Sequence, residues 1–176
     1  MMDATRSIIQ QIGLDNAAFN AEFFYDQTSD NVWFLEVNPR ISQSHAEIFE
    51  RVQGISHHSV MVDLALGRKP KPMEKKGKFN IAGHFMFRTF ESGLITRIPS
   101  DAAIQKLAQR QPRTVVKFQV QTGQHLKDLQ GQDMYSYEIA NVFIGGRDQM
   151  EMLDKYDESL AVLQFDIEKN EDIEIV

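Results

Sequence analysis

The chain has 176 residues, no cysteine and a formal net charge of −6 at pH 7, a length that suffices for one sizeable core or two small domains. The missing cysteine excludes disulfides, thiolate metal sites and a cysteine nucleophile, and the net negative charge argues against a nucleic-acid protein. Because no apolar run approaches the roughly 20 residues that span a bilayer and the first residues do not resemble a signal peptide, we expect a cytoplasmic protein outside the membrane.

The first part of the chain is predicted to form a helix, a strand hairpin and two further helices. Apolar residues recur at helical spacing over about 3–12 and predict a short opening helix. Two runs of β-favouring residues, 17–25 and 32–37, are separated by polar turn residues and predict an antiparallel hairpin. Helical spacing returns over 44–66, where Gly54 interrupts the run and favours two consecutive helices.

Residues 68–78, RKPKPMEKKGK, have the composition of an exposed linker. They contain two prolines, one glycine and six basic side chains. We place a domain boundary here, with a first domain over 1–67 and a second over 79–176.

The second domain is predicted to contain both strands and helices. A short helix is expected after Ser100, which can cap it, and a longer helix from Asp148 to about Leu163. The acidic end of the chain, 166–176, is expected to be a frayed strand or tail. The strand-like segments are 79–90, 94–98, 114–121 and 134–144.

Each strand of the predicted hairpin carries a glutamate near its middle. Glu22 lies in FNAEFFY and Glu36 in WFLEVNPR, where a carboxylate is costly to bury unless a cation meets it. Side chains alternate along a strand, so Glu36 and Asn38 share a face that Glu22 can reach across the hairpin. Two carboxylates and an amide oxygen suit Mg²⁺ or Mn²⁺, which bind phosphates as further ligands. The pattern predicts a metal site for a nucleotide; the alternative is that both glutamates lie on an ordinary solvated sheet face.

Arg40 follows directly after the predicted metal strand. Pro39 ends that strand because proline cannot donate a ladder hydrogen bond. An arginine at this strand end is well placed to stabilise negative charge on a phosphoryl or carboxyl oxygen. We therefore expect Arg40 to be a catalytic residue.

The segment EVNPRIS, preceded by the AEFF strand, resembles the C-terminal half of the ATP-grasp fold in biotin carboxylases and the large subunit of carbamoyl-phosphate synthetase. The resemblance implies an α+β chain: the C-terminal half of an ATP-grasp domain, an antiparallel sheet with helices, followed by a small domain like the C-terminal domain of biotin carboxylase. It also implies that Glu22, Glu36 and Asn38 bind the magnesium ions that bridge ATP phosphates, and that Arg40 assists acyl-phosphate or carboxylate chemistry.

Two apolar residues beside the metal ligands gain a role from the same resemblance. In the family, residues that flank the metal strand pack on adenine, which implies this role for Phe24 and Leu35. Ordinary core packing is the alternative for each.

The resemblance continues after the linker. AGHFMFR and SGLITRIP are similar to the first strands of the biotin-carboxylase C-terminal domain, which implies that Arg88 contacts substrate. The alternative is a surface arginine on an edge strand. The glutamate of the family's first-strand pattern and the lysine of its later strand are absent, which puts biotin as a substrate in doubt.

The histidines do not predict a transition-metal site. His57 and His58 are adjacent, so on a helix they point to different faces, and no third ligand stands at a motif spacing. We expect them to be surface or partly packed residues. His45 is expected to act through its position beside Arg40.

The segment before Glu22 contains neither the lysines nor the glycine-rich loop with which the family holds the triphosphate. We therefore expect this chain to need an N-terminal ATP-grasp half, from the same chain or a separate subunit, and to be inactive alone. The parent would be an ATP- and Mg²⁺-dependent ligase that activates a small-molecule carboxylate through an acyl-phosphate. Its acceptor would be an amine, as in amino-acid or peptide ligases, or a biotin-like nitrogen. The alternative is a non-catalytic interaction or dimerisation module, and exposed apolar surface would favour a homodimer.

Overall fold

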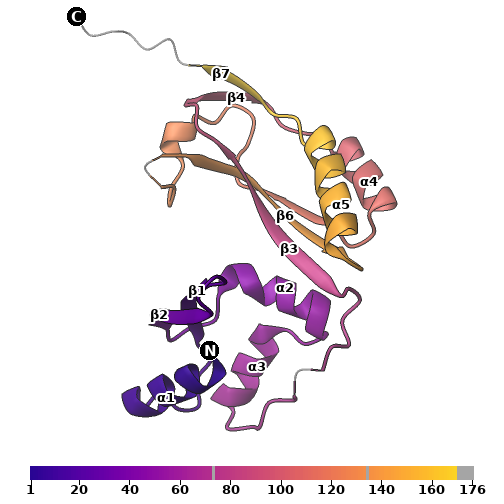
Figure 1. Ribbon diagram of the computed structural model, residues 1–176. Helices are drawn as coiled ribbons and strands as arrows, with labels where there is room; N and C mark the ends of the chain where they lie inside the picture. The colour runs from indigo at the N-terminus through magenta and orange to yellow at the C-terminus, as the bar shows by residue number, and fades with distance from the viewer. Residues whose placement is uncertain (73, 134, 170–176) are drawn as a thin grey trace, which may run out of the picture. The chain divides into compact units, whose positions relative to one another are not determined.

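The computed structural model describes residues 1–72, 74–133 and 135–169 (Figure 1). By their internal contacts these residues divide into two compact units, Met1–Lys78 and Phe79–Val176. None of the helices in the described ranges has the length and apolar character that crossing a bilayer requires.

The first unit consists of three helices and a two-stranded sheet, as its sequence predicts. Two of the helices end at glycines, because Gly13 (φ 68°) and Gly54 (φ 74°) adopt the left-handed conformation that terminates a helix. Ser56 caps the third by accepting a hydrogen bond from the His58 N–H. In chain order the elements are α1 (Met2–Ile12), β1 (Asn20–Asp26), β2 (Asn31–Asn38), α2 (Gln43–Gln53) and α3 (His57–Ala65).

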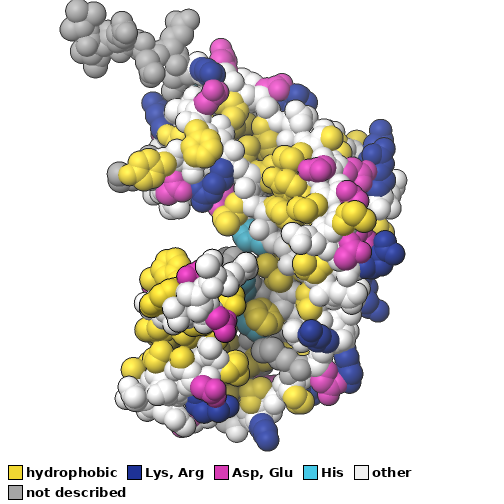
Figure 2. All heavy atoms as spheres, viewed as in Figure 1, with side chains coloured by type: hydrophobic (Ala, Val, Ile, Leu, Met, Phe, Trp, Pro, Cys, Tyr) yellow, Lys and Arg dark blue, Asp and Glu magenta, His cyan; other side chains and the backbone are white. Residues whose placement is uncertain are grey.

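Much of the β1–β2 hairpin is exposed, and Figure 2 shows hydrophobic side chains on the surface over it. Among the described residues of this unit, Ala46 is the one fully buried apolar side chain. A two-stranded sheet gains little stability by itself, so further apolar contact would stabilise this hairpin. Its exposed large apolar residues are Phe24, Tyr25, Val32, Trp33, Phe34 and Leu35.

The segment that joins the units is mostly exposed, as predicted, but its end is packed on α2. The Gly77 N–H donates a hydrogen bond to the Val52 carbonyl at 3.0 Å. A Cβ at Gly77 would collide with the backbone of Arg51 and Val52, so this approach requires glycine. Composition alone did not predict this contact.

The second unit is built on a three-stranded antiparallel sheet in the order β3-β6-β5, and Figure 1 shows its strands β3 and β6. A second sheet pairs β4 with β7, where Asp166 accepts two hydrogen bonds from the Arg97 guanidinium at 2.6 and 2.9 Å. The elements are β3 (Ile81–Thr89), β4 (Gly93–Arg97), α4 (Asp101–Arg110), β5 (Val115–Phe118), η1 (Leu126–Asp128), β6 (Tyr137–Gly146), α5 (Gln149–Val162) and β7 (Asp166–Lys169).

One face of the three-stranded sheet packs against α5 and forms the main hydrophobic core. Phe85 and Phe87 of β3 contact Tyr156 of α5, with ring centroids 4.4 and 5.8 Å apart. The burial of these rings and their neighbours provides the main stabilisation of the unit. The largest fully buried apolar side chains are Ile95, Leu107, Leu126, Val142 and Ile144.

A buried glutamine joins the end of α4 to α5. Gln111 is 1% exposed, and its side-chain amide donates to the Lys155 carbonyl at 2.9 Å and to Glu158 at 2.8 Å. Its carbonyl oxygen accepts from the Thr114 hydroxyl at 3.1 Å. The amide is thus satisfied on both ends, as a buried polar group must be.

The predicted start of β6 at residue 134 is too early. The strand begins at Tyr137, because the preceding loop is held by Asp133, whose carboxylate accepts the backbone N–H groups of Tyr135 at 3.0 Å and Ser136 at 2.7 Å. These two hydrogen bonds lower the pKa of Asp133, and the bond from the Tyr135 N–H has the larger effect. Of the predicted frayed end over 166–176, residues 166–169 form β7, whereas position 134 and residues 170–176 lie outside the described residues.

Candidate functional site

The hairpin places both predicted glutamates opposite each other. Glu22 and Glu36 are Cα partners in the antiparallel register, and Asn20 and Asn38 are the next pair on the same face. The alternation of the strands therefore gathers four oxygen-bearing side chains on one face. The Asn38 amide donates a hydrogen bond to Glu36 at 2.7 Å, which confirms the predicted shared face of these two residues.

Both glutamates are exposed, as the alternative of a solvated sheet face predicts, so the cost of burying a carboxylate does not argue for a cation here. Within the described part of the chain, neither Glu22 nor Glu36 takes part in an ion pair. Two like charges that face each other across a strand pair repel, and a cation between them would remove that repulsion. The argument for a cation thus rests on charge rather than on burial.

Asn20 is a further candidate residue on this face, which sequence reasoning missed. Its side-chain oxygen is buried and has no hydrogen-bond partner. A buried acceptor without a partner is costly, and a donor or a cation would satisfy it. Its position two residues before Glu22 was the available signal, because residues i and i+2 share a strand face.

The aromatic residue opposite Phe24 is Trp33, and both are exposed. Leu35, the other predicted adenine contact, is the extra residue of a β-bulge: Glu22 pairs with Glu36 and Phe23 with Phe34, so Leu35 has no partner. Trp33 therefore joins Phe24 as a candidate for ring stacking.

Arg40 lies two residues beyond the end of β2 and is exposed. Its backbone N–H donates to the Asn38 carbonyl at 2.8 Å, and its guanidinium donates to the Ile41 carbonyl at 3.3 Å. The turn thus keeps the arginine close in sequence and space to Asn38. His45 is hydrogen-bonded to Ser42 at 2.7 Å rather than to Arg40.

The other two histidines of this unit are packed or on the surface, as expected. His57 stacks on Phe49 with ring centroids 4.0 Å apart. Burial, and then the nearby His45 and His58, lower the pKa of His57. His58 is exposed. Across the described ranges, no group of three or more His, Asp or Glu side chains comes together to hold a metal; the hairpin offers two carboxylates and two amides instead.

Arg88 lies on β3, an edge strand of the second unit, and is held by several partners. It forms ion pairs with Asp133 and, at 3.3 Å, with Glu138. It also donates to the Ser136 hydroxyl at 2.6 Å. An arginine held in this way is oriented, and its side chain is still 31% exposed.

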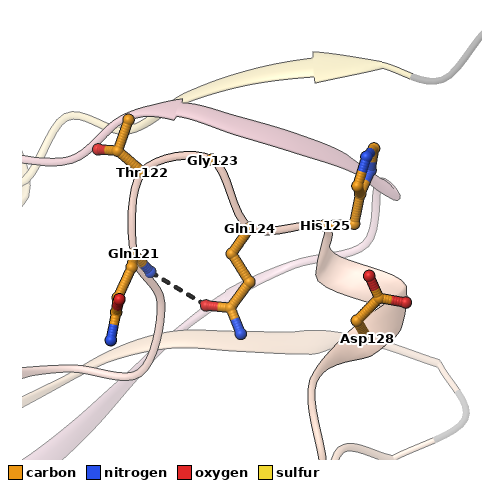
Figure 3. A pocket seen from close by; sticks show the side chains of 6 residues that line it. All are labelled: Gln121, Thr122, Gly123, Gln124, His125 and Asp128. Atoms are coloured by element: carbon orange, nitrogen blue, oxygen red, sulfur yellow. Dashed lines mark hydrogen bonds between the residues drawn. The ribbon is translucent and has the colours of Figure 1, made fainter.

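A shallow hollow of about 400 Å³ lies over the loop before η1 (Figure 3). In this loop the Gln121 N–H donates to the Gln124 side chain at 3.1 Å, while His125 and Asp128 line the other side. None of the predicted site residues lines this hollow. Its lining consists of Gln121, Thr122, Gly123, Gln124, His125 and Asp128.

An antiparallel hairpin with facing carboxylates is followed by two helices and by a second antiparallel unit. Residues 1–72 match the family model described as carbamoyl-phosphate synthase L chain, ATP binding domain. The chain is 26% identical over 121 residues to the carbamoyl phosphate synthase large chain of Xylella fastidiosa (strain 9a5c), an alignment that covers 67% of this chain and 11% of that protein. The predicted ATP-grasp resemblance is confirmed.

Solved structures show the same fold at low sequence identity. The L-amino acid ligase from Bacillus licheniformis has a TM-score of 0.72 at 18% identity, over 96% of this chain and 40% of that chain. Biotin carboxylase from Campylobacter jejuni, solved as a β-γ-ATP complex, has a TM-score of 0.63 at 18% identity, over 87% of this chain and 32% of that chain. The biotin carboxylase domain of Hydrogenobacter thermophilus 2-oxoglutarate carboxylase was solved with MgADP and bicarbonate. It has a TM-score of 0.58 at 17% identity, over 86% of this chain and 32% of that chain. This chain thus spans a minor part of each relative.

Proposed function

We propose that the β1–β2 hairpin binds the divalent cation that carries the phosphates of ATP in an ATP-dependent ligase. The observation that carries this proposal is the Glu22–Glu36 pair, two facing carboxylates without an ion pair among the described residues. The family match over residues 1–72 and the MgADP complex of a relative support it.

The residues on this face fit Mg²⁺ or Mn²⁺. All four side chains, Asn20, Glu22, Glu36 and Asn38, offer hard oxygen ligands, and the unpartnered oxygen of Asn20 gains a partner. The cation, when bound, neutralises phosphate charge and polarises the phosphoryl group. Arg40 is proposed to stabilise the negative charge that develops on the phosphoryl or carboxyl oxygen.

The nucleotide base is proposed to lie against the apolar part of the hairpin. Phe24 and Leu35 carry this role from the family resemblance, and Trp33 joins them because it pairs with Phe24. All three side chains are exposed, and an aromatic ring gains stacking energy from a base of any identity.

The reaction is proposed to be ligation through an acyl-phosphate, completed by an N-terminal ATP-grasp half from the same chain or a separate subunit. Residues 79–176 are proposed to be a small domain like the C-terminal domain of biotin carboxylase, in which Arg88 contacts the substrate. An amine acceptor is favoured over a biotin-like nitrogen, because the L-amino acid ligase covers 96% of this chain with a TM-score of 0.72.

A second candidate function is a non-catalytic interaction module. The observation that favours it is the exposed apolar surface of the hairpin, where Phe24 is 62% and Trp33 is 51% exposed. This function requires no cation on the face of Glu22 and Glu36. It predicts association that depends on Phe24 and Trp33 and not on a metal ion.

Binding of Mn²⁺, followed by electron paramagnetic resonance with and without ATP, tests the cation site. Glu36→Gln removes one ligand charge and should weaken Mn²⁺ binding roughly tenfold or more. Glu50→Gln is the matched control, because Glu50 is an exposed residue of α2 and carries the same charge.

Equal Mn²⁺ affinity in Glu36→Gln and Glu50→Gln would remove the hairpin from metal binding and overturn the proposal. Sedimentation of the same proteins with and without Mn²⁺ separates the two candidate functions. Self-association that is lost in Phe24→Ser but is indifferent to Mn²⁺ would favour the interaction module.

A further inference from the structure

The face of the three-stranded sheet opposite α5 carries a connected set of polar side chains. Because Phe85 and Phe87 of β3 pack on Tyr156 of α5, the alternate residues His84 and Arg88 project to the other face. They are four residues apart on the same strand. The functional assignments above leave His84 without a role.

A hydrogen-bond relay connects these two residues through β6. Arg88 donates to one carboxylate oxygen of Glu138 at 3.3 Å, and the Asn141 amide donates to the other at 2.6 Å. The carbonyl oxygen of Asn141 then meets Nε2 of His84. The relay therefore runs from Arg88 through Glu138 and Asn141 to His84.

The relay determines which nitrogen of His84 carries the proton. An ionised Glu138 can only accept, so the amide group of Asn141 must point toward it and the carbonyl oxygen must point toward His84. Nε2 must then be the donor. In neutral His84 the other nitrogen, Nδ1, is left as an acceptor with a lone pair. Among the described residues, Nδ1 has no hydrogen-bond partner.

The imidazole ring is also held in place by packing. It stacks on Phe143 with ring centroids 4.3 Å apart and planes 7° apart, and Phe143 is 5% exposed. Asn141 is 7% exposed, so the residue that orients His84 is itself buried. The charged groups on this face are Glu138, Arg88 and Asp133, together with Lys117 of β5, whose ammonium lies 4.8 Å from the Phe143 ring centre.

We propose that Nδ1 of His84 is the proton acceptor for an amine-bearing substrate, and that Asn141 and Glu138 are its positioning residues. The inference rests on the proposed ligase function with an amine acceptor. An ammonium group transfers one proton to Nδ1, which gives a neutral amine with a free lone pair and an imidazolium. The imidazolium is stabilised through Asn141 by the negative charge of Glu138. Arg88 lies on the same face to hold an anionic group of the same substrate.

The tautomer of His84 tests the positioning part on this chain alone. Long-range ¹H–¹⁵N correlation spectra of protein labelled with ¹⁵N at histidine distinguish the two tautomers. The chain has five histidines, and the signals that disappear in His84→Gln are those of His84. We expect Nε2–H in the native chain and a mixture in Asn141→Leu. His45, which bonds Ser42, is the internal control and should not change.

A second variant keeps this test interpretable if Asn141→Leu unfolds. Glu138→Gln conserves shape but allows the amide of Asn141 to rotate, so it should also release the tautomer. An Nδ1–H tautomer in the native protein, or Nε2–H retained in both variants, would overturn the relay.

Titration with methylamine tests the acceptor role, with sodium acetate as the control for the anion. Methylamine should shift the Nδ1 signal of His84 in native protein, and several-fold more should be needed in Asn141→Leu. Acetate should shift the guanidinium signals of Arg88 and leave Nδ1 in place. If methylamine leaves Nδ1 unchanged while the tautomer is Nε2–H, His84 is not the proton acceptor. Mn²⁺ binding at Glu36 is measured separately, so failure of the cation site does not produce this outcome.

Discussion

Glu22 and Glu36 face each other as direct partners across the β1–β2 hairpin, although both carry a negative charge. Without a cation this pair destabilises the hairpin, so Glu36→Gln should stabilise the first unit by about 0.5 kcal/mol or less. In the presence of Mn²⁺ the order should reverse, because the native protein binds the ion more tightly than the variant does. Urea unfolding followed by the fluorescence of Trp33, the single tryptophan, measures both conditions. A variant that is less stable than the native protein in both conditions would contradict this reading.

Gly77 is predicted to be essential for the docking of the linker end on α2. Gly77→Ala places a methyl group against the Arg51 carbonyl and breaks the hydrogen bond to Val52, so it should destabilise the first unit by about 1 kcal/mol or more. Trp33 fluorescence during urea unfolding reports the change. Lys78→Ala alters the exposed neighbour and should have little effect; equal effects of the two variants would show that the docking contributes nothing.

Gln111 is predicted to hold α4 and α5 together. Gln111→Leu leaves the Lys155 carbonyl and the Glu158 carboxylate without this donor, which should cost about 1–3 kcal/mol of unfolding free energy. Circular dichroism during urea unfolding measures the loss. The hydrogen bond from Gln111 is the largest cause of the lowered pKa of Glu158, so that pKa should also rise. Gln109→Leu, at an exposed position of α4, is the control.

Glu151 is predicted to make the second unit sensitive to acid. Hydrogen bonds from Lys155 and then from Arg147 lower the pKa of Glu151 from 4.5 to about 2. Because the folded state favours the ionised form, the stabilisation is fully present above pH 4.5 and is lost as the pH falls toward 2. Glu151→Gln should therefore lose less stability than native protein between pH 7 and pH 3.

The control for Glu151 removes a charge of the same sign from the same helix. Asp157→Asn changes an exposed residue of α5, so its loss of stability on acidification should match that of native protein. Unfolding of each protein at both pH values, followed by circular dichroism, gives the comparison. Native-like acid sensitivity in Glu151→Gln would assign the effect to other carboxylates.

Much of the fold was predictable because local signals decide it. Gly54 ends α2 because glycine tolerates the left-handed conformation, and Ser100 caps α4 by accepting a hydrogen bond from Ala103. The polar residues between β1 and β2 fix the register near the turn, and the bulge at Leu35 then shifts it by one residue and brings Glu22 to Glu36. In each case the determining residues are close in sequence.

The features that were missed depend on contacts between distant residues. His84 and Asn141 are 57 positions apart, and only the pairing of β3 with β6 brings them together. The docking of Gly77 on α2 depends on a backbone approach that linker composition does not predict. The apolar neighbours of the two glutamates could not decide between a buried and a solvated face; the two-stranded sheet leaves both glutamates exposed.

The bulge at Leu35 has a consequence for insertions and deletions. Loss of Val37, for example, places Asn38 opposite Ala21 and turns its side chain to the other face of the hairpin. Loss of Leu35 leaves Glu22 opposite Glu36 and Phe23 opposite Phe34, because Leu35 has no partner of its own. Leu35 is therefore a position at which β2 can lose a residue while the four oxygen-bearing side chains stay on one face of the hairpin.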